Sequence, residues 1–298
     1  MTSAPQIFDT AQLARYRQRA AAKIGAHDFL LQRVSEDFAD RLDAVKRQFR
    51  QVLDLGAHHG VIGRALGNRP GIANVISADA SPAMLEQCPE SRVLCDLEEL
   101  PFAEAQFDLV VSGLALHLVN DLPGTLIQIR RILKPDGLFL GAVLGGATLT
   151  ELRQAFVEAE SEIEGGASPR VAPFADVRDL GSLLQRAGFA LPVVDADMIT
   201  VAYATPLHLM REIRAFGAAN MLVERRRTPL KRATLMRAAE IYAERFSRAD
   251  GRVTATFEII TLTGWAPHEN QQKPLRPGSA KTRLADALGV PEYKPDDK

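Results

Sequence analysis

Three carboxylates that close three apolar runs are the residues best placed to do chemistry. Asp54 lies at the end of "QVLDLG", Asp79 closes "ANVISAD" and Asp96 closes "RVLCD". If these runs are strands of one parallel sheet, the three acids share one edge, where open sheets bind ligands. The alternative is that Asp54 and Asp79 only cap the helices that follow. Acids at three successive strand ends favour a binding site.

The turn after the first acid, "VLDLGAHHG", narrows the choice of ligand. Gly56 and Gly60 permit positive φ and a close approach to a ligand, but His58 interrupts the dinucleotide-binding pattern G-x-G-x-x-G. Asp79 lies 23 residues beyond Gly56, the spacing of a carboxylate that binds ribose hydroxyls. Asp54 would repel a pyrophosphate and attract an ammonium or a sulfonium. These features favour S-adenosylmethionine over NAD.

His58 is the unusual residue of this turn. A non-glycine residue held at positive φ costs about 1–3 kcal/mol, and the ring must either turn outward or narrow the pocket. His58 and His59 are sequence neighbours whose side chains diverge, and no H-x-D/E pair is present to complete an iron site. We therefore predict no metal here and expect the pair to face solvent or cap a helix.

Strands that alternate with helices must position these residues. Two further strands are predicted at "FDLVVSG" and "GLFLGAVLG", with helices near 10–24, 28–47, 60–67, 82–88 and 121–134. This order predicts parallel βαβ units in a sheet covered on both faces. Two later strands, "VVDADMITVAY" and "TATFEIITLTGW", alternate with helices near 206–216 and 229–248. They are either parallel, with crossovers, or an antiparallel pair.

Several residues predict where helices begin. Capping side chains precede a proline at Ser81, Thr205 and Thr228. Thr148 and Glu151 have the spacing of a capping box. "KPDG", residues 134–137, is typical of a turn between a helix and a strand.

Composition limits the class of protein. With 46% hydrophobic residues, 24% charged residues and a net charge of −1, the 298-residue chain predicts a globular fold with no general attraction to nucleic acid. No apolar run is long enough for a transmembrane segment, and the first 22 residues lack a secretory signal. Cys88 and Cys95 are the only two cysteines of the sequence, too few for a disulfide framework, and this indicates a reducing compartment. We expect a cytoplasmic location in a bacterium, or the mitochondrial matrix in a eukaryote.

Two features concern the substrate. His117 follows the fourth predicted strand, where it could act as a base for an amine or hydroxyl acceptor or simply bond a loop carbonyl. A basic segment could dock an acidic carrier protein or an acidic patch of another partner, or be a solvated helix face. Its cations are Arg225, Arg226, Arg227, Lys231, Arg232 and Arg237.

The motifs "VLDLGxxxG", "DxSPAML" and "LPFAEAQFDLVVSGLALHLVNDLPGTLIQIRRILKPDG" resemble the class I S-adenosylmethionine-dependent methyltransferase family. Within it the chain resembles the malonyl-carrier-protein O-methyltransferases of biotin synthesis. It resembles more closely the methyltransferase-like arginine hydroxylases of mitochondrial complex I assembly, through "EGGASPRVAPFADVRDLGSLLQRAGF", "DGRVTATFEIITLTGW" and "HENQQKP". The family loop usually has glycine at position 58, where this chain has histidine.

The resemblance implies a doubly wound α/β fold with a mostly parallel seven-stranded sheet whose last strand is reversed. We expect N-terminal helices over 1–48, the methyltransferase-fold domain over 49–266 with lid insertions near 147–175 and 204–250, and an extended tail over 267–298. The expected cofactor, S-adenosyl-L-methionine, would contact Asp54, Gly56, Ala57, Gly60, Asp79, Ala80, Asp96, Leu97 and Ser112.

The resemblance also implies that the enzyme modifies a protein, a complex I subunit, and leaves methylation or hydroxylation open. One alternative is O-methylation of a malonyl carrier protein. Another is a non-catalytic assembly chaperone whose cofactor site is degraded. The reason for this alternative is His58, which stands where the family loop usually has glycine.

Overall fold

A computed structural model describes residues 6–89, 91–271, 279 and 282–290 of the chain. The described residues up to Pro267 form one compact unit, and those from His268 onward form a second. Most of the predicted tail lies outside the described residues, and its described part contains the short helix α10 (Leu284–Leu288). None of the described helices is long and apolar enough to cross a membrane.

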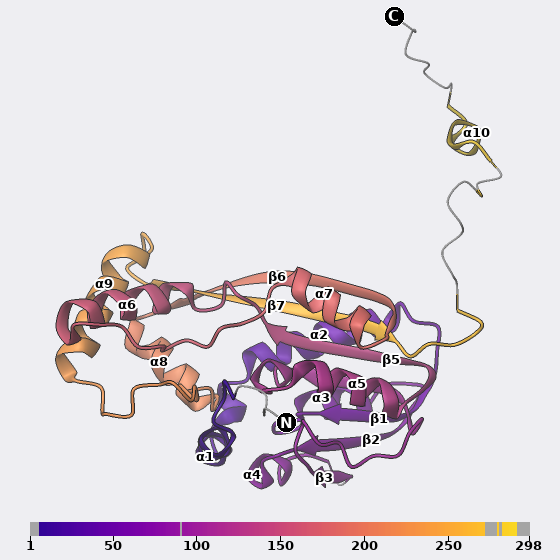
Figure 1. Cartoon of the computed structure of the whole chain (residues 1–298), viewed down its shortest axis with the longest axis horizontal. Coiled ribbons are helices and arrows are strands. Elements are labelled where there is room, and N and C mark those ends of the chain that lie inside the picture. The colour runs from indigo at the N-terminus through magenta and orange to yellow at the C-terminus, as the bar shows by residue number, and fades with distance from the viewer. Residues whose placement is uncertain (1–5, 90, 272–278, 280–281, 291–298) are drawn as a thin grey trace, which may run out of the picture. The chain divides into compact units, whose positions relative to one another are not determined.

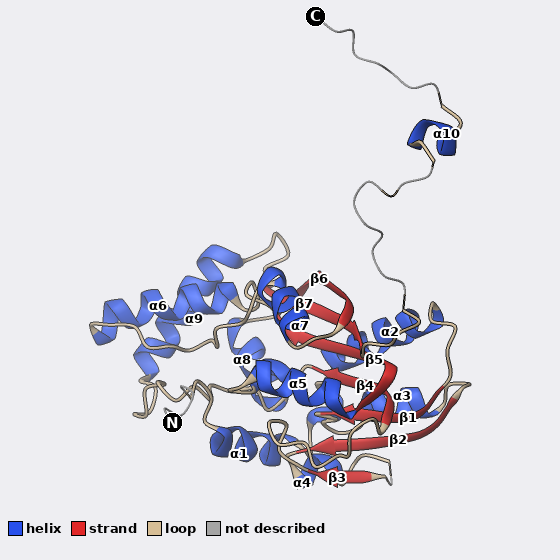
Figure 2. Cartoon of the chain, turned by 45° about the vertical axis from the view of Figure 1, so that its right-hand side comes forward, coloured by secondary structure: helices blue, strands red, loops and turns tan. Residues whose placement is uncertain are grey.

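Seven strands form one sheet in the order β3-β2-β1-β4-β5-β7-β6 (Figure 2). They are β1 (Phe49–Leu55), β2 (Ile72–Asp79), β3 (Arg92–Leu94), β4 (Phe107–Gly113), β5 (Leu133–Leu144), β6 (Ala190–Tyr203) and β7 (Val253–Trp265). The first five are parallel, and β7 runs antiparallel to both β5 and β6. The predicted mostly parallel sheet with a reversed last strand is confirmed, and the two late strands form the antiparallel pair.

Helices cover both faces of the sheet because the inner strands are apolar on both sides. Val52 packs on one face with α2 (Phe29–Asp43) and α3 (Val61–Gly67). Leu53, the next residue, packs on the other face with α5 (Leu122–Ile132) and α7 (Val177–Arg186). The predicted doubly wound architecture is therefore confirmed.

Four helices lie around the ends of the long strands β6 and β7 and of the first parallel strands. They are α1 (Thr10–Ala20), α6 (Thr150–Glu164), α8 (Pro206–Ala215) and α9 (Arg232–Phe246), and the short α4 (Pro82–Leu85) follows β2. Figure 1 shows α6, α8 and α9 grouped at one end of β6 and β7. Ion pairs join α9 to α6, among them Arg237 with Glu162 and Arg245 with Glu158.

The predicted helix starts at Thr205 and Ser81 are confirmed, and the one at Thr228 is wrong. The hydroxyl of Thr205 does accept from the His208 N–H, at 3.3 Å. Ser81 is the N-cap residue of α4 and precedes a first-turn proline, as predicted, but its side chain makes no capping bond. Its N–H donates to Asp79 at 2.8 Å. Helix α9 begins three residues after Pro229, with Lys231 as its N-cap residue.

The predicted capping box is also wrong, because both side chains bond the last strand. Thr148 exchanges hydrogen bonds with the backbone of Glu258, and Glu151 accepts from Thr256. These contacts fix the start of α6 to β7. The predicted turn at 134–137 is instead the beginning of β5, where Asp136 has a φ of 63°.

Two tyrosines of this region have buried hydroxyls, and only one of these hydroxyls has a partner among the described residues. Buried Tyr242 donates to the Thr254 carbonyl at 2.7 Å, whereas the buried hydroxyl of Tyr203 has no partner among the described residues. We expect Tyr242→Phe to lower the free energy of unfolding by about 1 kcal/mol. Tyr203→Phe should leave it unchanged or raise it, which urea unfolding of both variants measures. Equal losses in the two variants would contradict this assignment.

Candidate active site

Asp54 is completely buried at the end of β1. Its Oδ2 accepts from the Gly63 N–H at 2.9 Å, in the first turn of α3, while Oδ1 has no partner among the described residues. Burial raises the pKa of Asp54 to about 7, and the neighbouring Asp79 carboxylate adds to the rise. The helix-capping interpretation thus explains one oxygen of this carboxylate and leaves the other unsatisfied.

Asp79 is also completely buried, and both of its oxygens are engaged. Oδ1 accepts from the Ser81 N–H at 2.8 Å and Oδ2 from the His58 N–H at 3.0 Å. The Nη1 of Arg17, from helix α1, lies 3.2 Å and 3.3 Å from these two oxygens. Asp79 therefore holds the glycine turn, the start of α4 and the first helix of the chain together.

Asp96 differs from the other two acids. It is exposed and lies two residues beyond the end of β3 at Leu94, so it does not end that strand as predicted. Its Oδ1 accepts from the Glu98 N–H at 2.9 Å. With Ala80, Leu97 and Arg17 it lines a small cavity, so three predicted cofactor residues do meet there.

The glycine turn is packed tightly against the protein. Gly56 has a φ of 71°, and a Cβ on it would lie 2.2 Å from the Cβ of Ala115. Gly60 has a φ of 83°, and Ala57 between them is buried. The φ of Gly56 and the approach of the β4 exit both require glycine at position 56.

His58 turns into the protein and narrows the site. Its φ is 50°, as its place in the turn predicts, and its ring lies 5.7 Å from that of Phe216. Nε2 lies 3.1 Å from the Gly113 carbonyl, which can only accept, so Nε2 carries the proton and Nδ1 is a free acceptor. Burial lowers the pKa of His58 to about 4, and the ring is therefore neutral at pH 7.

His59 is also buried, with Nε2 2.9 Å from the Asp28 carboxylate. The expectation that the two histidines face solvent is wrong, because helices α1, α2 and α8 cover this edge. The described residues contain no group of three or more His, Cys, Asp or Glu side chains able to hold a metal.

His117 and Ser112 lie at the exit of β4. The Nδ1 of His117 and the hydroxyl of Ser112 are buried and have no partner among the described residues, so Nδ1 does not bond a loop carbonyl. The His117 ring meets Phe174 edge-on at 5.5 Å. Burial, and then the Arg17 guanidinium, lower the pKa of His117 well below its ordinary value. His117 therefore offers a neutral imidazole at neutral pH.

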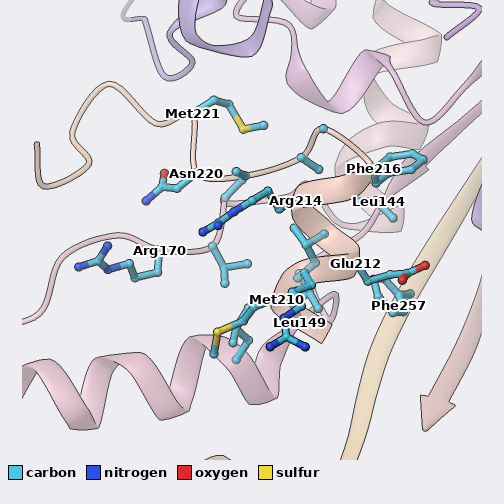
Figure 3. A pocket seen from close by; sticks show the side chains of 18 of the residues that line it. Leu144, Leu149, Arg170, Met210, Glu212, Arg214, Phe216, Asn220, Met221 and Phe257 are labelled. Atoms are coloured by element: carbon cyan, nitrogen blue, oxygen red, sulfur yellow. The ribbon is translucent and has the colours of Figure 1, made fainter. Parts of the chain in front are cut away.

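A cavity of about 470 Å³ opens beside these histidines. Its lining is mostly apolar and comes from α2, α6, α8 and the loops that follow β4 and α8. Figure 3 shows Glu212 and Arg214 projecting in different directions from α8, with Arg170 on a neighbouring loop. Glu212 bonds Nδ1 of His27 at 2.8 Å. His58, His117 and Arg17 also line the cavity. His58 and Arg17 bond Asp79, so they stand between the cavity and that acid.

The residues present fit S-adenosylmethionine with one exception. Polar atoms that are buried and unpartnered gather at this edge, as a polar ligand requires. They are Arg17 Nη2, Asp54 Oδ1, His58 Nδ1, Ser77 Oγ, Ser81 Oγ, Ser112 Oγ and His117 Nδ1. The exception is Asp79, whose oxygens already accept from protein donors.

Arg17 is the site residue that the sequence analysis missed. Its signal lies in helical spacing, because Arg17 stands between Leu13 and Ala20, four residues after one and three before the other. Both packed neighbours are apolar, which places Arg17 on the inner stripe of α1. A charged residue on such a stripe needs a buried partner.

The basic segment is largely paired within the chain. Arg225 bonds Asp9, both Arg226 and Lys231 bond Glu164, and Arg237 bonds glutamates of α6 and α9. These ion pairs join the segment 225–237 to α6 and to the residues just before α1. They leave less charge free for an acidic partner than the sequence indicated.

The chain matches known proteins along nearly its whole length. The family model described as "Methyltransferase domain" matches residues 53–141. The chain is 38% identical over 296 residues to "Arginine-hydroxylase NDUFAF5, mitochondrial" of Danio rerio, covering 97% of this chain and 92% of the relative. The human protein of that name is 42% identical over 276 residues, covering 91% and 79%. The chain belongs to the methyltransferase-fold family that includes NDUFAF5.

Further relatives of this NDUFAF5 family agree with the fold. The "Malonyl-[acyl-carrier protein] O-methyltransferase" of a Methylovorus species is 33% identical over 309 residues, covering 99% of this chain and 98% of the relative. A solved putative methyltransferase from Bacillus halodurans has a TM-score of 0.55 at 17% identity, covering 78% of this chain and all of the other. The predicted resemblance is confirmed, and the chain is a methyltransferase-fold enzyme.

The buried carboxyl of Asp54 predicts a dependence of stability on pH. The unfolded chain ionises Asp54 near its ordinary pKa of 3.8 and the folded protein only near 7, so stability falls as pH rises between these values. Asp54→Asn removes this loss and should stabilise the protein by roughly 4 kcal/mol above pH 7. Below pH 3.8 the same substitution should change the free energy of unfolding little, because Asp54 is then protonated in both states.

Urea unfolding at about pH 4 and about pH 8 measures this difference. Asp96→Asn is the matched control, because its carboxyl is exposed. A gain for Asp54→Asn that is equal at both pH values would contradict the assignment.

Proposed function

We propose that this protein is an S-adenosylmethionine-dependent enzyme that modifies a partner protein, a subunit of respiratory complex I, during its assembly. The observation that carries the proposal is the apolar cavity of about 470 Å³ lined by Arg17 and His58, the two residues that bond the buried Asp79. The NDUFAF5 relatives, similar over nearly the whole chain, support it. Their printed name includes "mitochondrial"; we propose the corresponding matrix in a eukaryote and the cytoplasm in a bacterium.

The cofactor side of the site is the carboxyl edge of β1, β2 and β4. When bound, S-adenosylmethionine supplies a methyl group on a sulfonium. The free oxygen of Asp54 is a partner for its ammonium, Asp79 for its ribose hydroxyls, and the small cavity at Asp96 and Leu97 for its adenine. Gly56, Ala57, Gly60, Ala80 and Ser112 shape the same edge.

The partner side of the site is the large cavity. The NDUFAF5 relatives are named as arginine hydroxylases, and an arginine entering here would meet Glu212, the acid that lines the cavity. Glu212 bonds His27, which an entering guanidinium could replace. The neutral imidazoles of His58 and His117 can accept a hydrogen bond or a proton from the substrate.

Removing the gene tests the biological role. We expect complex I assembly and NADH dehydrogenase activity to fall, and the wild-type gene to restore them. Asp54→Asn should not restore them, although we expect it to be the more stable protein, because it lacks the charge for the cofactor ammonium. Full complex I activity in the deleted strain would refute the role. Full rescue by Asp54→Asn would refute the enzymatic part.

Methylation of a carrier-bound acid is the second candidate, and the cationic groups of the cavity favour it. Arg211 and Arg214 are exposed at the cavity, so an acidic acyl group would find complementary charge there. The malonyl-carrier O-methyltransferases are also relatives of the chain. Purified protein, labelled S-adenosylmethionine and malonyl carrier protein decide it: absence of transferred label rejects this candidate.

Cofactor binding by the wild type and by a His58→Gly variant tests whether the protein is only an assembly chaperone. The His58 ring occupies space between the glycine turn and Phe216, so His58→Gly should bind S-adenosylmethionine about tenfold more tightly than the wild type. Calorimetry measures both affinities. Micromolar binding by the wild type rejects the chaperone alternative, and absence of binding by both proteins at millimolar cofactor supports it.

A further inference from the structure

The oxygens of Asp79 have no capacity left for a ribose. A carboxylate has about four acceptor positions, and Asp79 uses them for the Ser81 N–H, the His58 N–H and two contacts from Arg17. The two backbone donors belong to the turns that build the site. Arg17 is therefore the donor that must yield when two ribose hydroxyls bind.

Arg17 cannot simply lose its partner. The residue is 4% exposed, and a buried guanidinium without an anion is strongly unfavourable. A ligand whose hydroxyls displace Arg17 from the Asp79 carboxylate must therefore either supply another anion for Arg17 or drive the Arg17 side chain out of the protein.

The fold around α1 opposes expulsion. Phe8 pairs with Leu222 of the lid as an antiparallel bridge, and Asp9 forms an ion pair with Arg225. On the other side, the Asn120 side chain accepts from the Phe8 N–H at 2.8 Å. Because these contacts hold the segment just before α1 from two sides, a shift of the Arg17 side chain is easier than a departure of the helix.

The guanidinium of Arg17 faces the space in which a replacement anion would bind. Arg17 lines both the small cavity assigned to the adenine and the large cavity assigned to the partner, so it lies where the amino-acid end of the cofactor would meet the partner side. Its Nη2 is buried without a partner among the described residues.

We propose that Arg17 is a cofactor-binding residue that exchanges Asp79 for the carboxylate of the amino-acid end of the cofactor. This inference rests on the proposed cofactor. The exchange leaves Asp79 to the ribose hydroxyls and keeps the buried guanidinium paired with an anion. A nucleoside without a carboxylate would have to break the Arg17–Asp79 pair without replacing it. The exchange therefore favours the complete cofactor over its fragments.

Calorimetry with two ligands tests the exchange. S-Adenosylhomocysteine and 5′-methylthioadenosine share the ribose hydroxyls, but only the first has a carboxylate. Arg17→Met frees Asp79 for both ligands and removes the carboxylate partner of the first. The ratio of Kd for methylthioadenosine to Kd for adenosylhomocysteine should therefore fall about tenfold or more relative to the wild type.

The matched control is Arg19→Met, on the exposed side of the same helix, which should keep the wild-type ratio. Arg17→Gln should reproduce the fall if Arg17→Met does not fold, and thermal unfolding checks each variant. An unchanged ratio overturns the exchange, whether both ligands bind more tightly or neither changes. If no variant binds adenosylhomocysteine at millimolar concentration, the proposed cofactor is wrong and this inference fails with it.

Discussion

Burying two carboxylates at one edge of the sheet is the constraint on which the site depends. Asp54 and Asp79 are both fully buried, and each buried charge requires donors or a counter-ion. Asp54 has one backbone donor and a raised pKa, whereas Asp79 has two backbone donors and a guanidinium. The two neighbouring acids thus have different environments, one poised to receive a cation and one already holding a cation of the protein.

The cation on Asp79 connects the sheet to the lid. Arg17 belongs to α1, and the residues just before α1 pair with the lid segment that walls the large cavity. Ion pairs continue from that segment to α6, through Arg226 and Glu164. The long strands β6 and β7 carry α6, α8 and α9 at one end (Figure 1). A continuous series of contacts therefore joins Asp79, the first helix and the wall of the large cavity.

Apolar patterning was sufficient to predict the sheet, and polar contacts between distant segments were not predictable. "FDLVVSG" can be buried on both faces only inside a covered sheet, and it is β4. The antiparallel β6–β7 pair depends on how α8 and α9 pack, which local sequence leaves open. Thr148 bonds Glu258, 110 residues away, instead of capping α6. Arg17 and Asp79 are 62 residues apart, and only the fold brings them together.

His58 shows why a departure from a family pattern need not be damage. Its positive φ costs about 1–3 kcal/mol, but its N–H bonds Asp79 and its ring bonds the Gly113 carbonyl. A glycine would relieve the strain and lose the ring bond and the contact with Phe216. Because burial lowers the pKa of His58 to about 4, the ring offers the cavity a neutral acceptor in one fixed tautomer. The unpartnered Nδ1 is thus held in a fixed position at the cavity by the two bonds that the residue makes on its other side.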